Sequence, residues 1–228
     1  MILKRICVSM VAVAMTVSFI PVVVFAKEAD SQSDDTAIIE IAGEKSVKPA
    51  KLETGSAVAY YEGKCGKNLK WKLYTGNGKL VISGSGAMYN YGKGKAPWYK
   101  HRSIIKTVSI SGGTTIGNYA FFNCNALTKV SGGSKITIIG KRAFSYCSKL
   151  SSFTITSKKL KKIGAYAFTH SNKLKTISIK KTTKLTFKGI KKCLKGSKVK
   201  TVKVKKSKRF AYRVYFKVNS GRKSVKVK

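Results

Sequence analysis

The sequence has very few acidic residues, and their placement is uneven. Its 228 residues include 8 Asp and Glu against 47 Lys and Arg, for a formal net charge of +39 at pH 7. All eight acids precede residue 63, so the chain from there to residue 228 carries 41 Lys and Arg and no carboxylate side chain. Catalysis by a pair of carboxylates is excluded over that range, because the groups that would donate and accept protons are absent.

Long hydrophobic runs are also scarce, since only residues 6–26 form one. This run follows a short basic start and ends in Val24-Phe25-Ala26, with a small residue where a signal peptidase cleaves. The pattern predicts a signal peptide at residues 1–26 and an exported protein with no transmembrane segment after its removal. An uncleaved membrane anchor is the alternative, because about twenty apolar residues suffice to cross a bilayer.

Residues 27–62 differ in charge from the rest of the chain. They hold all eight acids against four lysines and have few aromatic side chains, a composition typical of a flexible linker. The basic remainder repels itself, so it requires either a sturdy scaffold or bound anions.

The scaffold is visible as a repeated motif. IGNYAFFNCNAL begins at Ile116, IGKRAFSYCSKL at Ile139 and IGAYAFTHSNKL at Ile163. Each copy leads into a kernel with residues facing the core at offsets 0, 3 and 5 from its final leucine, and weaker copies begin at Ile105 and Val199. Repeats of 20–29 residues with an L-x-x-L-x-L kernel are typical of leucine-rich solenoids, in which each coil adds one strand to a parallel ladder.

The repeated residues have distinct packing roles in this prediction. The isoleucine enters the core, the glycine allows a tight turn where a side chain would crowd the backbone, and Ala-Phe forms the short outer segment. We therefore predict a β-rich α/β fold, a leucine-rich repeat solenoid at residues 104–207. Its parallel strand ladder is joined by short helical or irregular convex segments.

The pattern IGxxAFxxCxxL followed by a strand resembles that of BspA-like leucine-rich repeat proteins, which are found on bacterial surfaces. The resemblance extends upstream to residues 65–110, which look like the β-rich segment that leads into such repeats. It implies adhesion to host or matrix proteins, or contact with other bacteria. Residues 185–198 depart from the pattern, because KGIKKCLKGSK stands where Ala-Phe is expected.

A β-hairpin is predicted to cap the N-terminal end of the solenoid at residues 63–103. Three apolar residues alternate on one face of a strand: Leu69, Trp71 and Leu73. The following TGNGK supplies a hairpin turn, and Leu80-Val81-Ile82 makes a second strand. Trp98 and Tyr99 are then expected to cover the open end.

A second cap is predicted at residues 208–228. The segment SKRFAYRVYFKV indicates one or two aromatic helical turns, and Asn219-Ser220-Gly221 stops them before a last strand. Such terminal caps are required in solenoids, because the last coil would otherwise expose its apolar face.

Candidates for catalysis are few. Only two histidines occur, His101 and His170, and no acid in the folded region can orient either of them. Cys147 and His170 lie on adjacent coils and form a conceivable nucleophile and base. The alternative is that Cys147 is a buried apolar residue and His170 a surface residue. We expect no catalytic residue and no enzyme activity.

Metal binding is equally poorly supported. Cys124 and Cys147 share one repeat position and should stack a coil apart, with Ser171 on the next rung. They are either buried thiols or a disulfide, depending on whether the coil spacing suits the bond geometry. Two thiols and one histidine fall short of a zinc site, so we expect no metal and no cofactor.

The outward side chains of the strand ladder form the first candidate binding surface. They are rich in Ser and Thr with lysines at intervals, and solenoids commonly bind partners on such a face. The residues assigned to partner binding are Lys106, Thr107, Thr128, Lys129, Lys175, Thr176, Lys200, Thr201 and Lys203.

Lysine clusters in the loops form a second candidate surface, for polyanions. Its residues are Lys158, Lys159, Lys161, Lys162, Lys180, Lys181, Lys191, Lys192, Lys205, Lys206, Lys208 and Arg209. Lysines outnumber arginines 41 to 6, which favours diffuse charge attraction over bidentate recognition of particular groups. A role in solubility alone is the alternative.

These features together predict an exported, monomeric, non-enzymatic binding protein of the bacterial cell surface. We expect a host or bacterial surface protein on the strand face, and an anionic cell-wall polymer or acidic polysaccharide on the lysines. The alternative function is an extracellular polyanion-binding protein of the wall or biofilm matrix. Nucleic acid is a secondary candidate, because export favours other polyanions.

Overall fold

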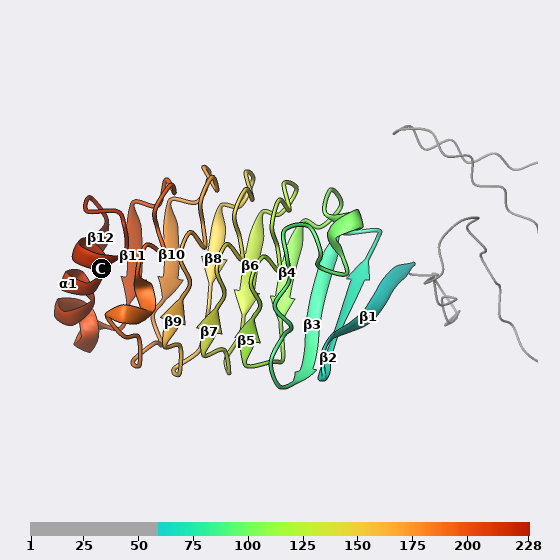
Figure 1. Cartoon of the computed structure of the whole chain (residues 1–228), viewed down its shortest axis with the longest axis horizontal. Helices are drawn as coiled ribbons and strands as arrows, with labels where there is room; N and C mark the ends of the chain where they lie inside the picture. The colour runs from blue at the N-terminus through green and yellow to red at the C-terminus, as the bar shows by residue number, and fades with distance from the viewer. Residues whose placement is uncertain (1–58) are drawn as a thin grey trace, which may run out of the picture.

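The computed structural model describes residues 59–228, which form one elongated solenoid (Figure 1). The predicted signal peptide and the linker up to residue 58 lie outside the described residues. The first strand begins at Tyr60, so residues 60–62 of the expected linker belong to a strand. Within the described range, no helix has the length and apolar character needed to cross a membrane.

A nine-stranded sheet runs along the described chain from end to end (Figure 1). Its first three strands are antiparallel: β1 (Tyr60–Gly66), β2 (Asn68–Tyr74) and β3 (Lys79–Ser85). The rest form a parallel ladder beside β3: β4 (Thr107–Ile110), β6 (Lys129–Gly132), β8 (Ser152–Thr154), β10 (Thr176–Ile179), β11 (Thr201–Val204) and β12 (Lys226–Val227). Each of the five predicted kernels supplies one strand of this ladder, which confirms the predicted solenoid.

A second, smaller sheet was not predicted. It contains three parallel strands: β5 (Thr115–Ile116), β7 (Ile138–Ile139) and β9 (Lys162–Ile163). Each strand ends at the isoleucine of the Ile-Gly motif, and these isoleucines are at most 1% exposed. The motif therefore pairs backbone with the neighbouring coil in addition to filling the core.

Aromatic rings stack along the core from coil to coil. The ring centroids of Phe121 and Phe144 are 5.1 Å apart, those of Phe144 and Phe168 are 5.9 Å apart, and both pairs are within 8° of parallel. Trp98 stacks on Phe121 at 5.2 Å, and its Nε1 donates a hydrogen bond to the carbonyl of Ala120 at 2.8 Å. Trp98 thus covers the N-terminal end of the stack as predicted, and the short 3-10 helix η1 (Tyr99–His101) follows it.

The glycine after each motif isoleucine lies where two coils approach most closely. A Cβ built on Gly140 would lie 2.5 Å from the backbone nitrogen of Asn118, and one on Gly164 would lie 2.5 Å from that of Lys141. Real Cβ atoms do not approach backbone atoms so closely, so a side chain there would push the coils apart. This confirms the prediction that a side chain in place of these glycines would crowd the backbone.

The outer segments of the coils are turns that contain strained residues. Two positions in each turn adopt a left-handed backbone, and all of these residues except Gly196 in the last turn are non-glycine. The first holds Tyr119, Arg142, Tyr166 and Lys192, and the second holds Asn123, Tyr146 and His170. Their amides are paired with the next coil; the N–H of Tyr119, for example, donates to the carbonyl of Lys141 at 3.0 Å.

The copy that lacks Ala-Phe is accommodated by a local change. Cys193 and Leu194, both fully buried, stand where other coils have Ala and Phe, after the 3-10 helix η2 (Lys188–Ile190). The N–H of Leu194 donates to the carbonyl of Ser220 at 2.8 Å, which joins this coil to the C-terminal segment.

The C-terminal end is closed by a helix and a strand. The 3-10 helix η3 (Lys206–Lys208) leads into α1 (Arg209–Asn219), which buries Tyr212 and Phe216, and β12 follows. The helix has 11 residues, so the expectation of one or two turns was too short. The hydroxyl of Tyr212 accepts a hydrogen bond from the amide of Leu185 at 3.1 Å and ties the helix to the preceding coil.

Replacing Gly140 by alanine should destabilise the solenoid. The added Cβ would meet backbone atoms, which cannot move aside without separating the coils, so Gly140→Ala should lower the free energy of unfolding by about 3 kcal/mol. Gly76→Ala is the matched control, because nothing lies within 4 Å of a Cβ there. Urea unfolding followed by circular dichroism measures both, and equal stabilities of the two variants would contradict the close-approach argument.

Candidate functional site

The described part of the chain has almost no negative charge to balance its lysines. Glu62 is the one carboxylate side chain between residues 59 and 228, and its Oε2 lies 3.4 Å from Nζ of Lys72. No other acidic side chain exists in this range to pair with a lysine or arginine. The surface therefore attracts anions from solution wherever its cations gather.

The structure aligns the predicted partner-binding residues in rungs across the ladder. The strand pairing places one outward residue from each strand side by side: Thr107, Lys129, Ser152, Thr176, Thr201 and Lys226. Lys203 lies on the neighbouring rung beside Ser178. The sequence missed Lys226 because β12 has only two residues and no kernel pattern.

Four further predicted residues lie just before the strands, at the edge where the chain enters the sheet. Lys106, Thr128, Lys175 and Lys200 occupy the same repeat position and are exposed. The hydroxyl of Thr128 donates to the carbonyl of Lys106 at 2.9 Å. The hydroxyl of Thr128 therefore links two coils. Of the three ammonium groups, that of Lys175 donates a hydrogen bond to the carbonyl of Asn172 at 2.9 Å.

Many of the predicted polyanion-binding lysines follow the strands of successive coils. Lys158 and Lys159 come after β8, Lys180 and Lys181 after β10, and Lys205 after β11, and all five are exposed. Lys206, Lys208 and Arg209 continue this edge through η3 into α1. The structure thus brings these residues to one edge of the solenoid.

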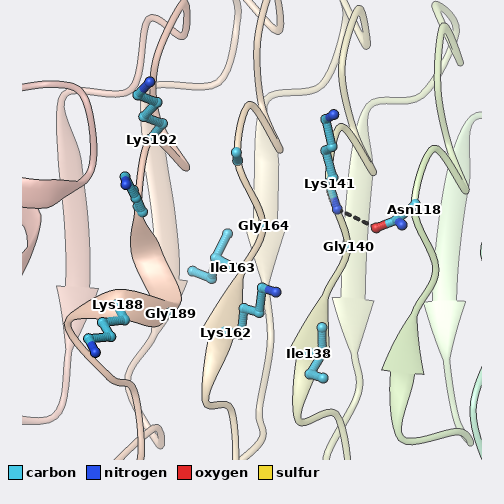
Figure 2. A pocket seen from close by; sticks show the side chains of 12 residues that line it. Asn118, Ile138, Gly140, Lys141, Lys162, Ile163, Gly164, Lys188, Gly189 and Lys192 are labelled. Atoms are coloured by element: carbon cyan, nitrogen blue, oxygen red, sulfur yellow. Dashed lines mark hydrogen bonds between the residues drawn. The ribbon is translucent and has the colours of Figure 1, made fainter.

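Three of the four remaining predicted lysines lie around a hollow beside the second sheet. Lys162, Lys191 and Lys192 line it together with Lys141 and Lys188, and its volume is about 450 Å³. We call this site the lysine hollow; Figure 2 shows how its side chains surround the ends of β7 and β9. Lys161 lies next to Lys162 in sequence and is not among its lining residues.

Glycines and a backbone contact shape the floor of the lysine hollow. Gly140 and Gly164 line it without side chains, and Ile138 contributes an apolar surface that is 37% exposed. The amide of Lys141 donates to Oδ1 of Asn118 at 2.7 Å, which holds the two turns together (Figure 2). The hollow therefore combines open space with five lysines, whose positive charge attracts anions.

Sequence reasoning missed Lys141 and Lys188. Lys141 directly follows an Ile-Gly motif, at the repeat position of Asn118 and Ala165, so alignment of the copies contains a signal for it. Lys188 lies in η2, in the copy that departs from the pattern. No repeat register could have placed it.

The thiols occupy structural positions. Cys147 is fully buried, and its Sγ donates to the carbonyl of Phe121 at 3.1 Å. One coil later, the hydroxyl of Ser171 donates to the carbonyl of Phe144 at 2.6 Å. Cys124 and Cys147 are both free, which favours buried thiols over the disulfide.

The geometry does not support a Cys147–His170 nucleophile. Burial raises the pKa of the Cys147 thiol well above its usual value, so the thiolate is disfavoured. His170 is exposed and stacks on Tyr146 with ring centroids 4.5 Å apart. Among residues 59–228, no group of three His, Cys, Asp or Glu side chains is placed to hold a metal ion.

Comparison with known proteins identifies similar repeats. Residues 96–221 match the BspA type leucine rich repeat region, in six copies. A leucine-rich repeat protein from Eubacterium ventriosum ATCC 27560 is 28% identical with a TM-score of 0.46, covering 66% of this chain and 45% of that one. The T. pallidum leucine rich repeat protein TpLRR is 15% identical with a TM-score of 0.37, covering 61% of this chain and 70% of that one.

The match to the Eubacterium ventriosum protein spans less than half of that protein's length. No curated protein matches the sequence significantly.

Cys124 and Cys147 should resist thiol reagents in the folded protein. Burial raises the pKa of Cys124 to about 12, and burial also raises the pKa of Cys147 well above its usual value. Thiolate is therefore scarce at about pH 8 and should increase only as the pH rises or the protein unfolds. Alkylation followed by peptide mass spectrometry should label both only after denaturation. Rapid labelling of Cys147 but not Cys124 in the folded protein would indicate an activated nucleophile instead.

Proposed function

Because the chain belongs to the family with the BspA type leucine rich repeat region, we propose that it is a non-enzymatic binding protein of the bacterial cell surface. In this proposal the strand face meets a protein partner, and the lysines hold the molecule on an anionic polymer. Both roles use side chains that the core does not need. Solenoids of this kind present extended surfaces suited to protein interaction.

The observation that carries the proposal is the gathering of five lysines around one hollow in a region without carboxylates from residue 63 onward. Like charges brought together repel, so the arrangement gains stability from a bound anion. Ammonium groups act as strongly hydrated point charges, which suits a flexible polymer such as an anionic cell-wall polymer or acidic polysaccharide. Binding of this type weakens as salt screens the charges.

The strand face supports the protein-binding role. Its rungs present hydroxyl groups with lysines at intervals, at the spacing of about 4.8 Å between neighbouring strands. Side chains at these positions are free to vary, because their neighbours on the inner face make the core. We propose a host or bacterial surface protein as the partner.

A second candidate function rests on the lysine hollow alone. If the polymer is the only ligand, the protein is an extracellular polyanion-binding protein of the wall or biofilm matrix. The hollow and the edge lysines would then be the whole site, and the strand face would bind nothing. Nucleic acid is the secondary candidate polymer for this function.

Retention on bacterial walls should be sensitive to salt and depend on the lysine hollow. The purified protein should sediment with Gram-positive cell walls at about 0.15 M salt and be released well below about 1 M. The variant K162Q/K188Q/K191Q/K192Q should bind about tenfold more weakly at the lower salt, because four charges are lost from one site. The control K64Q/K67Q/K70Q/K79Q removes four exposed lysines elsewhere and should change binding little.

Equal losses of wall binding in both variants would show that total charge, and not the lysine hollow, retains the protein on the wall. Failure of the unaltered protein to sediment even at low salt would contradict wall retention altogether.

Substitutions on the strand face should affect a protein partner selectively. The variant K129A/K175A/T176A should abolish binding to the immobilised surface or matrix protein that the unaltered chain recognises, while wall binding stays unchanged. Surface plasmon resonance against a panel of such proteins measures the first effect and sedimentation the second. Binding to no protein, with intact wall binding, would favour the polyanion-binding alternative.

A further inference from the structure

A second hollow lies on the outer turns of the first coils, next to the N-terminal cap. Its lining includes Lys93, Tyr99, Tyr119, Phe122, Arg142 and Tyr146, and its volume is about 490 Å³. That volume is within the range of about 300–1,000 Å³ found for small-molecule sites. We call it the aromatic hollow; it shares no lining residue with the lysine hollow.

Arg142 distinguishes the aromatic hollow from the rest of the surface. It is the single arginine between Arg102 and Arg209, a stretch in which every other cation except His170 is a lysine. Its Nε is buried and has no hydrogen-bond partner among the described residues. An unpaired buried donor is costly, so a ligand acceptor that draws the Arg142 side chain toward the hollow would remove this cost.

The backbone conformation at Arg142 is unusual for a residue other than glycine. Its φ is 51°, in the left-handed region where non-glycine residues are strained. The equivalent position in other coils holds Tyr119, Tyr166 or Lys192, so the left-handed turn does not itself require an arginine. The guanidinium carbon of Arg142 lies 5.2 Å from the centroid of the Tyr166 ring on the next coil.

The aromatic rings of the hollow form a corner. Tyr119 and Phe122 are tilted by 60° with centroids 5.7 Å apart, and Phe122 and Tyr146 by 65° at 5.5 Å. The inclined faces leave a wedge-shaped space that a puckered sugar ring can enter, and stacking of a nucleobase on one ring alone is the competing outcome. Nζ of Lys93 lies 5.6 Å from the Phe122 centroid and adds positive charge.

We propose that the aromatic hollow binds a sugar residue bearing a carboxylate, such as a uronic acid of an acidic polysaccharide. The Arg142 guanidinium pairs with the carboxylate, because its planar N–H groups match the two oxygens. Tyr119 and Tyr146 contact the apolar C–H face of the sugar. The site uses none of the residues of the lysine hollow or the strand face, so it stands independently of the proposed function.

Titration calorimetry of the purified protein with trigalacturonic acid tests the proposal. Saturable binding should occur at about 0.15 M salt, and the neutral trisaccharide maltotriose should not bind. Arg142→Gln should weaken binding at least about tenfold, and Arg142→Lys nearly as much, because a lysine cannot pair with both oxygens. Lys173→Gln is the matched control: it removes one charge from an exposed turn outside both hollows, and should change binding less than about twofold.

Tyr119→Asn provides a second route if the Arg142 variants fold poorly, since asparagine tolerates the left-handed backbone. This variant should also bind trigalacturonic acid more weakly, and circular dichroism should show that it is folded. Equal losses in Arg142→Gln and Lys173→Gln, equal binding of maltotriose, or absence of saturable binding would overturn the proposal. Tighter binding of oligothymidylate that is lost in Arg142→Gln would also overturn it, in favour of nucleic acid.

Discussion

The close approach of successive coils is the constraint on which the rest of the structure depends. One coil is too thin to bury its own apolar face, so its core residues are covered only by the coils before and after it. Gly140 and Gly164 permit this approach, because a Cβ at either position would overlap the backbone of the preceding coil. The same spacing brings Phe121, Phe144 and Phe168 into a continuous stack. The second sheet then pairs the backbone at the motif isoleucines.

This constraint also explains how so basic a surface is tolerated. Neighbouring strands place their side chains close together, and like charges directly opposite each other are destabilising. On the strand face, Lys129 is flanked by Thr107 and Ser152, and Lys203 lies opposite Ser178. Hydroxyl-bearing residues therefore separate the lysines of the parallel ladder, whereas Lys64 and Lys70 lie opposite each other between β1 and β2. Lysines come together instead at the edges and turns, where side chains can spread into solvent or around a bound anion.

The two hollows differ in the chemistry they offer. The lysine hollow combines ammonium groups with a floor of glycine and isoleucine, which suits many anionic groups about equally. The aromatic hollow combines one guanidinium, one ammonium and inclined rings, which suits a ligand with both a carboxylate and an apolar face. Both lie on turns and strand ends outside the buried core. Binding sites can therefore change in this scaffold without disturbing the stack of coils.

The sequence by itself determined the repeated interior of this protein. The kernels, the Ile-Gly motif and Trp98 were predictable because stacking requires each coil to present the same residues at the same offsets. The tertiary structure decided what carries no such requirement: the second sheet, the substitution of Cys193 and Leu194 for Ala-Phe, and the length of α1. It also decided the grouping of Lys141 and Lys188 with the predicted lysines, and the corner of rings around Arg142. The outward lysines are not fixed by the core packing that repeats from coil to coil, so only the folded turns determine which of them meet.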